Sequence, residues 1–379
     1  MAELRQPETI LVYRDRIVPR SEAHFLRRLY IGFERLAPVW VGRWRDDGLA
    51  DLGAEPLLLG RGGARGAVAR ALFKQLGILP RYPDLRALHA RLVHAHFGRG
   101  GALALPIARA LKIPLVVTFH GGDATKNTHY RRRLVPTVFQ RRLAALQREA
   151  ALFICVSDFI RDQLLARGFP ADKLLVHRYG VELDDAGDAV DTHEPAILFA
   201  GRFVEKKGIL QLIEAMQRLA AQGTRAPLVL IGDGPIAGDL KRKAAALGNV
   251  EFPGWLPNAE LRRRMRGALA VCVPSLHGAD GDAEGLPNVV IEAMAAGAPV
   301  VGSRHAGIVE AIEHGRTGLL VPEGDPQALA DALGQLIAQP ELRRRLGAAA
   351  RLVAAERFDA VKQSRRLEAI LLRVAAGNR

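Results

Sequence analysis

The sequence predicts an α/β protein made of two doubly wound units, each with a parallel sheet covered by helices on both faces. Short, continuously apolar runs alternate with helical stretches, a pattern typical of strands buried on both faces. The alternation stops once, at an acidic, turn-rich segment, and then begins again. The length of 379 residues also suits two domains of ordinary size.

The first predicted unit covers residues 1–183. Its apolar runs, which we expect to be buried strands, are residues 9–13, 92–97, 114–120, 151–157 and 173–179. Residues 102–112 and 158–168 have the composition of helices between such strands. The acidic residues 184–195 follow and are predicted to be a linker.

The second predicted unit, residues 196–357, repeats the same rhythm. Its expected strands are residues 196–202, 227–235, 250–255, 269–275, 299–303 and 317–322. Residues 358–379 form an amphipathic stretch with no strand after it, which could cap the second unit or cross back to the first. Folds of this type bind ligands at the carboxyl ends of their strands, so we expect a cleft between the two units.

Composition excludes several classes of protein. Charged residues make up 25% and hydrophobic residues 49% of the chain, which argues against wholesale disorder. The two cysteines, Cys155 and Cys272, lie in apolar runs and are expected to be buried and inert, so a disulfide scaffold or a multi-cysteine zinc site is excluded. The sequence shows no signal peptide and no bilayer-spanning run, so we expect a cytoplasmic protein that is soluble or lies on a membrane surface.

The net charge of +14 is concentrated in the first half of the chain, with +11 in residues 1–190 and +3 in residues 191–379. Such a half suits nucleic acid, an anionic membrane or an anionic substrate. Residues 61–81 and 131–148 are basic and amphipathic, like helices that lie on anionic lipid, although a solvated basic face has the same sequence. No nucleic-acid partner is expected, because aromatic residues are not interleaved with the basic ones.

The segment FAGRFVEKKGIL, residues 199–210, places cationic side chains at the end of an expected strand. Gly201 allows a tight exit from the strand, Arg202 follows it, and Lys207 precedes the next helix. A guanidinium and an ammonium beside a helix start could hold a phosphate group. A solvated turn with an exposed arginine is the alternative.

The segment EGLPNVVIEAMAAGAPVV, residues 284–301, sets Glu284 in a loop and Glu292 about one turn into a helix. Pro287 suits the first turn of that helix, and the free backbone N–H groups of residues 286–289 could hold an anion. Two carboxylates around an anion site could accept hydrogen bonds from hydroxyl groups on either side of it. A polyol, a diphosphate and a second polyol in a row describe a nucleotide sugar. Taken singly, either glutamate is better explained as a surface acid or a helix-terminal acid, and the combination with Arg202 and Lys207 favours the binding site.

In the first half, two histidines end expected strands. His120 is followed by a glycine pair and Asp123, and His96 is followed by Gly98 and a helix. A histidine at the carboxyl end of a strand can line a cleft, although a hydrogen-bonded core histidine is the alternative. We expect His94 to point away from His96 and to be structural.

These motifs resemble the GT-B-fold retaining glycosyltransferases of family 4 (group 1). The resemblance rests on the GR…KG pattern at 201–208, on GDGP at 232–235, which includes Gly234, and on the two glutamates of EGLPNVVIE with their EAMAAGAPVV tail. It spans nearly all of residues 90–330. In the style of its motifs the chain is most similar to exopolysaccharide enzymes of the colanic-acid type.

The resemblance implies a role for each candidate residue. Glu284 would contact the donor sugar and Glu292 the ribose, while Arg202 and Lys207 would neutralise the diphosphate, so that no metal and no cofactor is needed. His120 would face the donor sugar. The remaining implied donor-binding residues are Gly201, Gly234, Gly285, Leu286, Pro287 and Asn288, and the implied acceptor-side residues are His96, Gly98 and Asp123. The final helix, within residues 358–379, would return to the first unit.

The implied reaction is the transfer of a hexose from a UDP- or GDP-sugar, with retention, to a glycan or a polyprenyl-diphosphate-linked acceptor. The motifs contain no obvious covalent nucleophile, so we expect the acceptor hydroxyl to attack from the face that the diphosphate leaves. Two departures from the family pattern stand out. RIVPRSEAHF replaces the glycine-rich loop after the first strand, and RYGVE replaces PNGVD at 178–182.

Two other functions fit parts of the pattern. A sugar-nucleotide epimerase of the same fold would use the donor site without an acceptor. A basic protein without catalytic activity would bind a membrane surface but would leave the paired glutamates unexplained.

Overall fold

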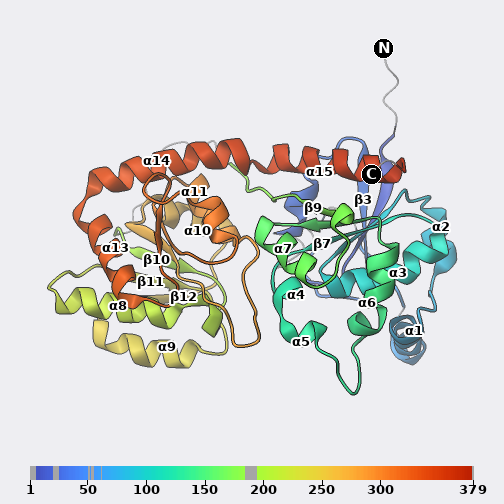
Figure 1. The fold of residues 1–379 in the computed structure, drawn as a ribbon, viewed down its shortest axis with the longest axis horizontal. Coiled ribbons are helices and arrows are strands. Elements are labelled where there is room, and N and C mark those ends of the chain that lie inside the picture. The colour runs from blue at the N-terminus through green and yellow to red at the C-terminus, as the bar shows by residue number, and fades with distance from the viewer. Residues whose placement is uncertain are drawn as a thin grey trace, which may run out of the picture. The chain divides into compact units, whose positions relative to one another are not determined.

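The chain forms two compact units, and a computed structural model describes residues 6–19, 25–49, 52, 55–60, 62–183 and 194–377 (Figure 1). The first unit consists of residues 1–180 and 360–379, and the second of residues 181–359. The expected linker, residues 184–195, lies outside the described residues except for Glu194 and Pro195.

A seven-stranded parallel sheet forms the centre of the first unit, in the order β5-β3-β1-β6-β7-β8-β9. Its strands are β1 (Glu8–Tyr13), β3 (Leu36–Gly42), β5 (Leu57–Leu58), β6 (Val93–His96), β7 (Leu115–Phe119), β8 (Leu152–Cys155) and β9 (Leu174–Val176). All five predicted strands of this half are confirmed, whereas β3 and β5 were not predicted. Two short strands, β2 (Arg16–Ile17) and β4 (Trp44–Arg45), pair separately.

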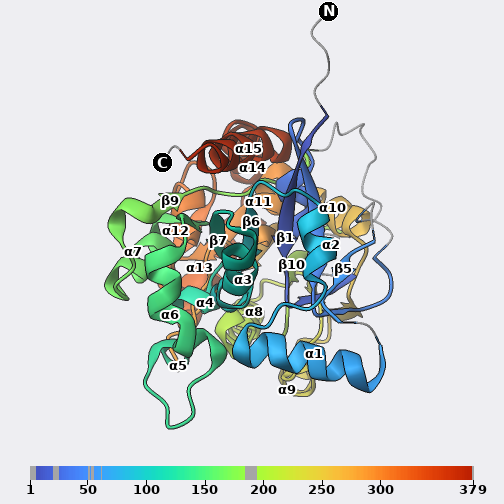
Figure 2. The same ribbon diagram turned by 90° about the vertical axis from the view of Figure 1, so that its right-hand side faces the viewer.

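Helices flank this sheet, and α3 packs on β6 and β7 (Figure 2). The helices are α1 (Gly63–Leu76), α2 (Tyr82–Ala87), α3 (Gly98–Leu111), α4 (Gly122–Thr125), α5 (Asn127–Tyr130), α6 (Val138–Glu149), α7 (Asp158–Ala166) and α15 (Ala360–Ala375), with 3-10 turns η2 (Leu26–Tyr30) and η4 (Ala171–Lys173). The expectation of one helix over 131–148 is wrong for residues 131–137, which form a loop. The helix starts after Thr137 because the side chains of Thr137 and Gln140 form a capping box there.

The last helix, α15, is tied to the chain that leads into β3. Oε1 of Glu368 accepts hydrogen bonds from the backbone N–H groups of Glu34, Arg35 and Leu36, at 2.9, 2.7 and 2.8 Å. Oγ of Ser364 accepts from the N–H of Gly32 at 2.9 Å. These contacts give partners to four backbone donors, two of which belong to the buried residues Gly32 and Leu36, so α15 completes the first unit.

A six-stranded parallel sheet forms the centre of the second unit, in the order β12-β11-β10-β13-β14-β15. The strands are β10 (Ile197–Ala200), β11 (Leu228–Ile231), β12 (Val250–Gly254), β13 (Ala270–Val273), β14 (Val300–Ser303) and β15 (Leu319–Val321). All six were predicted. Four of them, β10, β11, β13 and β14, are four residues long and buried along their whole length, as expected for a sheet covered on both faces.

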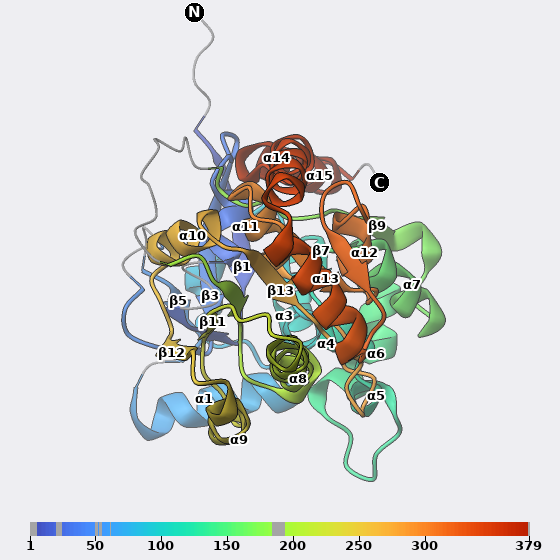
Figure 3. The same ribbon diagram turned by 90° about the vertical axis from the view of Figure 1, so that its left-hand side faces the viewer.

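The helices of the second unit pack on this sheet, and α8 lies beside α13 (Figure 3). They are α8 (Ile209–Ala221), α9 (Ala237–Ala244), α10 (Asn258–Arg266), α11 (Asn288–Ala295), α12 (Ile308–Ala311), α13 (Pro326–Ala338) and α14 (Pro340–Arg357), with 3-10 turns η5 (Glu205–Lys207) and η6 (Ala245–Leu247). The start of α13 is fixed by Asp325, whose side chain accepts from the N–H groups of Gln327 and Ala328.

In both sheets the order of the strands reverses at the first strand of the unit. In the first unit β1 lies between β3 and β6, and in the second unit β10 lies between β11 and β13. Loops that leave the two strands at such a switch point diverge and open a crevice at their carboxyl ends. Candidate site residues should therefore follow β1 and β6 in the first unit, and β10 and β13 in the second.

Two further expectations can be set against the structure. Cys155 and Cys272 are buried and unpaired, and burial raises the pKa of both thiols, that of Cys155 to about 12, which keeps them protonated and unreactive. Among the described residues, no helix has the length and apolar character needed to cross a bilayer.

Candidate active site

The candidate active site of the second unit is built around an ion-paired glutamate. Nζ of Lys207 lies 3.1 Å from Oε2 of Glu284, and Nζ of Lys206 lies 3.2 Å from Oε1. The lysines belong to the turn after β10, and Glu284 belongs to the loop after β13. The structure thus joins two motifs that are far apart in sequence, at the switch point of the sheet.

The two lysines keep Glu284 ionised. The Glu284 side chain is only 12% exposed, and burial alone would raise its pKa. The charges of Lys207 and Lys206 outweigh burial and lower the pKa of Glu284 to about 2. Glu284 is therefore an acceptor of hydrogen bonds near neutral pH and not a proton donor.

Lys206 is held by a second carboxylate as well. Its Nζ lies 3.0 Å from Oδ1 of Asp282, which belongs to the same loop as Glu284. Burial lowers the pKa of Lys206, but Glu284 and Asp282 reverse this effect and raise it. Lys206 and Asp282 were not among the predicted site residues; the adjacent lysines in EKKG and the acidic DGDAEG run were the available signals.

The turn that carries the lysines is fixed by close backbone packing. Gly208 has φ +66°, and a Cβ atom there would lie 1.8 Å from the carbonyl oxygen of Pro274. Only glycine fits this approach, which holds the lysine turn against the exit of β13. Gly201 donates its N–H to the carbonyl of Ile231, and Gly234 lies against the backbone of Phe203, so the GDGP loop supports the same turn.

Arg202 follows Gly201 at the carboxyl end of β10 and is exposed. Its guanidinium makes no hydrogen bond or ion pair with any of the described residues. The structure therefore brings Lys207, but not Arg202, into contact with Glu284. The guanidinium of Arg202 is left available to an anion at this end of the sheet.

The helix that carries Glu292 starts later than expected. Pro287 was expected in the first turn but is the N-cap residue, and α11 begins at Asn288. Gly285, Leu286 and Pro287 are buried. Oδ1 of Asn288 is buried and has no hydrogen-bond partner among the described residues. Glu292 lies half-buried one turn into α11, where a carboxylate can reach a ligand near the helix start.

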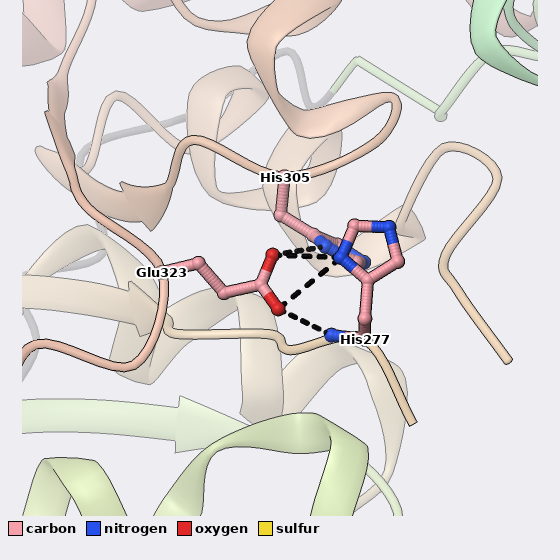
Figure 4. A group of neighbouring side chains, drawn as sticks. All are labelled: His277, His305 and Glu323. Atoms are coloured by element: carbon pink, nitrogen blue, oxygen red, sulfur yellow. Dashed lines mark hydrogen bonds and ion pairs between the residues drawn. The ribbon is translucent and has the colours of Figure 1, made fainter. Parts of the chain in front are cut away.

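Two residues that the sequence did not single out position the Glu284 loop. The N–H of Glu284 donates to Nε2 of His305 at 3.4 Å, and Nδ1 of His305 lies 2.9 Å from Oε2 of Glu323 (Figure 4). His305 follows β14 and is fully buried, while Glu323 follows β15. The loop carrying Glu284 is therefore tied through His305 to the ends of the two neighbouring strands.

His277, His305 and Glu323 could also be considered as metal ligands, since their ligand atoms lie within 4.8 Å of one another. Nδ1 of His277 lies 2.9 Å from the same oxygen of Glu323 that faces His305 (Figure 4). However, Nε2 of His305 accepts the N–H of Glu284, which places the ring proton on Nδ1. A protonated Nδ1 donates to Glu323 and cannot bind a metal, so the geometry favours a hydrogen-bonded network.

The histidines of the first unit form one hydrogen-bonded chain. The hydroxyl of Tyr30 lies 2.8 Å from Nδ1 of His94 and 2.7 Å from Nε2 of His96, and Nδ1 of His96 lies 3.1 Å from Nε2 of His120. The expectation that His94 points away from His96 is wrong, because residues two apart on a strand face the same side. Burial lowers the pKa of all three histidines, so the chain is neutral near pH 7.

His120 is the member of this chain with a free ring atom. Its Nδ1 is buried and has no hydrogen-bond partner among the described residues. His120 also lies against Phe97, with ring centroids 4.5 Å apart. Phe97 has φ +67°, a strained conformation for a non-glycine residue, in the turn from β6 into α3.

Gly98 and Asp123, predicted on the acceptor side, stabilise the turns after β6 and β7. Oδ2 of Asp123 accepts from the N–H of Gly98 at 3.0 Å, and Oδ1 accepts from the N–H groups of His120 and Gly121 at 3.0 and 2.9 Å. A Cβ atom on Gly98 would lie 2.6 Å from the ring of Phe119. Both residues therefore have a structural task, whatever ligand the turns hold.

Two family models match most of the chain. The model for glycosyl transferases group 1 matches residues 182–353, and that for glycosyltransferase family 4 matches residues 51–185. The phosphatidyl-myo-inositol mannosyltransferase of Mycobacterium leprae is 30% identical over 275 residues, which cover 71% of this chain and 69% of that protein. The chain belongs to the group 1, family 4 glycosyltransferases.

Two other relatives are glycosyltransferases named for the biosynthesis of amylovoran and colanic acid. The amylovoran biosynthesis glycosyltransferase AmsK of Erwinia amylovora is 39% identical over 253 residues, which cover 64% of this chain and 60% of that protein. The putative colanic acid biosynthesis glycosyltransferase WcaL of Escherichia coli is 34% identical over 248 residues, which cover 63% of this chain and 59% of that protein. The match thus spans about three fifths of the length of each of these two relatives.

Solved structures share the fold. Anabaena Alr3699/HepE, solved in complex with UDP-glucose, has a TM-score of 0.76 and 20% sequence identity, over 96% of this chain and 99% of that one. The predicted fold class, GT-B with two doubly wound Rossmann-like units, is confirmed.

Proposed function

We propose that this chain is a retaining, metal-independent hexosyltransferase that moves a sugar from a UDP- or GDP-sugar to a glycan or lipid-linked acceptor in exopolysaccharide biosynthesis. The observation that supports it most is the buried ion pair of Lys207 and Glu284 at the switch point of the second sheet. AmsK, a relative, is named for amylovoran biosynthesis, and HepE, a structural neighbour, was solved with UDP-glucose.

In this proposal Lys207 exchanges partners when the donor binds. Its ammonium is paired with Glu284, and a diphosphate beside it would compete for that charge. Lys206 and Asp282 would keep Glu284 in place and ionised, ready to accept hydrogen bonds from the donor sugar. Arg202, whose guanidinium is free among the described residues, would take a second share of the phosphate charge.

The same arrangement supports catalysis without a metal ion. Departure of the nucleoside diphosphate leaves an oxocarbenium-like sugar and a developing negative charge, which fixed cations can stabilise. Glu284 is ionised but closely paired with two lysines, which makes it a weak nucleophile. We therefore favour attack by the acceptor hydroxyl from the side of the leaving group, with Gly98, His96 and Asp123 on the acceptor side and His120 facing the donor sugar.

The donor site is tested by titrating UDP- and GDP-sugars into the wild-type chain and Lys207→Ala, with Lys243→Ala as the control. Lys243 is an exposed lysine of α9. We expect selective binding that Lys207→Ala weakens about tenfold or more, as for loss of a charge-assisted contact, and that Lys243→Ala preserves. Absence of binding by any nucleotide sugar would contradict the proposal.

The reaction itself is tested by product analysis with and without an added glycan acceptor. Glu284→Ala should abolish transfer, and a product that forms without any acceptor would identify an epimerase instead. The configuration of the transferred sugar distinguishes retention from inversion. Full activity after treatment with a chelator is expected for a metal-independent enzyme.

A further inference from the structure

A cationic cavity of about 500 Å³ lies in the first unit, beside the loop that connects α5 and α6. Four basic side chains contribute to its lining: Lys74, Arg99, Arg133 and Arg141. Its one carboxylate, Asp123, directs both oxygens toward backbone N–H groups. The cavity therefore carries an excess of positive charge that its own acid does not neutralise.

Arg133 is an exposed arginine of this cavity whose side chain is available to a ligand. Its guanidinium makes no hydrogen bond or ion pair with the described residues, whereas Arg99 is paired with Asp15 and Arg141 with Gln75. An unpaired guanidinium at the rim of a cationic cavity is suited to a phosphate group.

The loop beside the cavity exposes apolar side chains to water. Leu134 and Val135, which follow Arg131, Arg132 and Arg133, have relative exposures of 104% and 83%. Figure 1 shows the chain between α5 and α6 as a loop that projects beyond these helices. Apolar residues at the tip of a basic loop are unfavourable in water and favourable at the boundary between lipid headgroups and acyl chains.

The base of this loop is held firmly. Nε2 of Gln140 donates to the carbonyl of Arg131 at 2.6 Å, and Thr137 accepts the N–H of Gln140. The capping box thus fixes both ends of residues 131–137. Because both ends of the loop are fixed, the exposure of Leu134 and Val135 is a feature of a defined loop.

Helix α1, which also lines the cavity, exposes apolar residues as well. It contributes Lys74 and Gln75 to the lining and exposes Val68 and Leu76, with relative exposures of 58% and 69%. Arg142 of α6 donates to the carbonyl of Lys74, so α1 and α6, the helix that follows the loop, are in contact. Two of the elements that line the cationic cavity, α1 and the loop, therefore expose apolar residues.

We propose that this cavity binds the phosphate group of a polyprenyl lipid whose apolar chain stays in the bilayer, with Leu134 and Val135 inserted at the membrane surface. Arginine supplies charge and hydrogen bonds to the phosphate, while the other exposed arginines attract the anionic headgroups around it. The inference rests on the proposed function in one respect: there the bound lipid carries the glycan whose hydroxyl accepts the sugar.

The test is co-sedimentation of the full chain with three kinds of vesicle: phosphatidylcholine alone, phosphatidylcholine with phosphatidylglycerol, and phosphatidylcholine with polyprenyl phosphate at the same total negative charge. We expect binding in the order polyprenyl phosphate, phosphatidylglycerol, phosphatidylcholine. Equal binding to the two anionic vesicles would overturn the phosphate site, and no binding to either would overturn the whole inference.

Paired variants separate the apolar side chains of the loop from the basic side chains that line the cavity. Leu134→Ser with Val135→Ser should reduce binding to both anionic vesicles about tenfold or more, whereas the control Leu352→Ser, an exposed leucine of α14, should not. Arg133→Ala with Arg141→Ala should remove the preference for polyprenyl phosphate, whereas Arg86→Ala on α2 should keep it. If the tip variant abolishes self-association of the chain instead of vesicle binding, the surface joins two copies and the inference is wrong.

UDP binding, measured on the same preparations, distinguishes this inference from the proposed function. Both paired variants should bind UDP like the wild type, because their residues lie outside the second unit. Vesicle preference without any nucleotide binding would refute the transferase and leave the lipid-phosphate site standing. Nucleotide binding without vesicle preference would do the reverse.

Discussion

At the scale of single residues, the candidate site is a balance of charge in which each ion has a different task. Glu284 is shared by two lysines, but only Lys206 has a second carboxylate, Asp282, to hold it. Lys207 can therefore leave for a ligand while Glu284 remains paired. If the turn had a single lysine, its binding to the ligand would leave Glu284 without an ion-pair partner.

The charge of Glu284 predicts a pH dependence of stability. The pKa of Glu284 is lowered from 4.5 to about 2 in the folded chain, so its contribution is present above pH 4.5 and is lost as the pH falls toward 2. This lowering corresponds to about 3 kcal/mol. Urea unfolding between pH 7 and pH 3 should show a loss of stability in the wild type that Glu284→Gln lacks.

The matched control for that experiment is Glu356→Gln, which changes an exposed glutamate of α14. It should retain the wild-type slope of unfolding free energy against pH. The same slope in Glu284→Gln would mean that other groups, such as the buried histidines, account for the acid sensitivity.

At the scale of elements, the ends of three neighbouring strands cooperate to hold one loop. The loop after β13 carries Glu284, the residues after β14 contribute His305, and the residues after β15 contribute Glu323. Sheet register places these side chains together although about forty residues separate the first from the last. We therefore regard His305 and Glu323 as positioning residues for Glu284.

Removing the charge of Glu323 should loosen this loop. Glu323→Gln weakens the hydrogen bond that orients His305, so we expect the rate of transfer to fall about tenfold while UDP affinity stays within about twofold. Steady-state kinetics with separate kcat and KM values measure the effect. His277→Ala also alters a neighbour of Glu323 but not the contact with Glu284, and it should keep the wild-type rate. Equal losses in the two variants would contradict the positioning role.

At the scale of the whole molecule, the two units have separate sheets, and each is closed by its own hydrogen bonds. Glu368 belongs to the first unit and satisfies three backbone N–H groups before β3. Asp325 belongs to the second unit and caps α13. A chain of this kind is not expected to unfold in a single two-state step.

Calorimetry should therefore resolve two transitions that respond to different substitutions. Glu368→Ala leaves buried donors without partners and should lower the melting temperature of one transition by several degrees. Asp325→Ala removes a helix cap worth about 1 kcal/mol and should lower the other by a few degrees. A shift of both transitions by either change would show that the units unfold together.

Much of this architecture could be predicted because buried parallel strands are continuously apolar. Strands β10, β11, β13 and β14 could be predicted from such apolar runs. Strand β3 was missed because Pro38 interrupts its apolar run, and a proline within a run argues against a strand. The expected helix over 131–148 was too long at its start. It was predicted from its basic, amphipathic pattern, and that pattern does not show that Thr137 caps the helix.

The sequence predicted those site residues that can be recognised within a single motif. Glu284 and Lys207 were chosen from their own motifs, and the structure places them 3.1 Å apart. His305 and Glu323 were missed because their relation to Glu284 depends on which strands are neighbours, whereas Lys206 adjoins Lys207 in the EKKG motif and could have been chosen with it. Sequence spacing does not give that information, and the order of the sheet does.

The second unit, residues 181–359, lies in the sequence between the two parts of the first unit, residues 1–180 and 360–379. During translation the ribosome therefore delivers every residue of the second unit before it delivers α15. Until Ser364 and Glu368 are synthesised, the backbone N–H groups before β3 lack these hydrogen-bond partners, and the first unit is incomplete. Although domains usually fold in the order of their synthesis, the one that is started first here is the one that is finished last. A stop codon placed just before α15 would consequently damage the first unit and leave residues 181–359 complete.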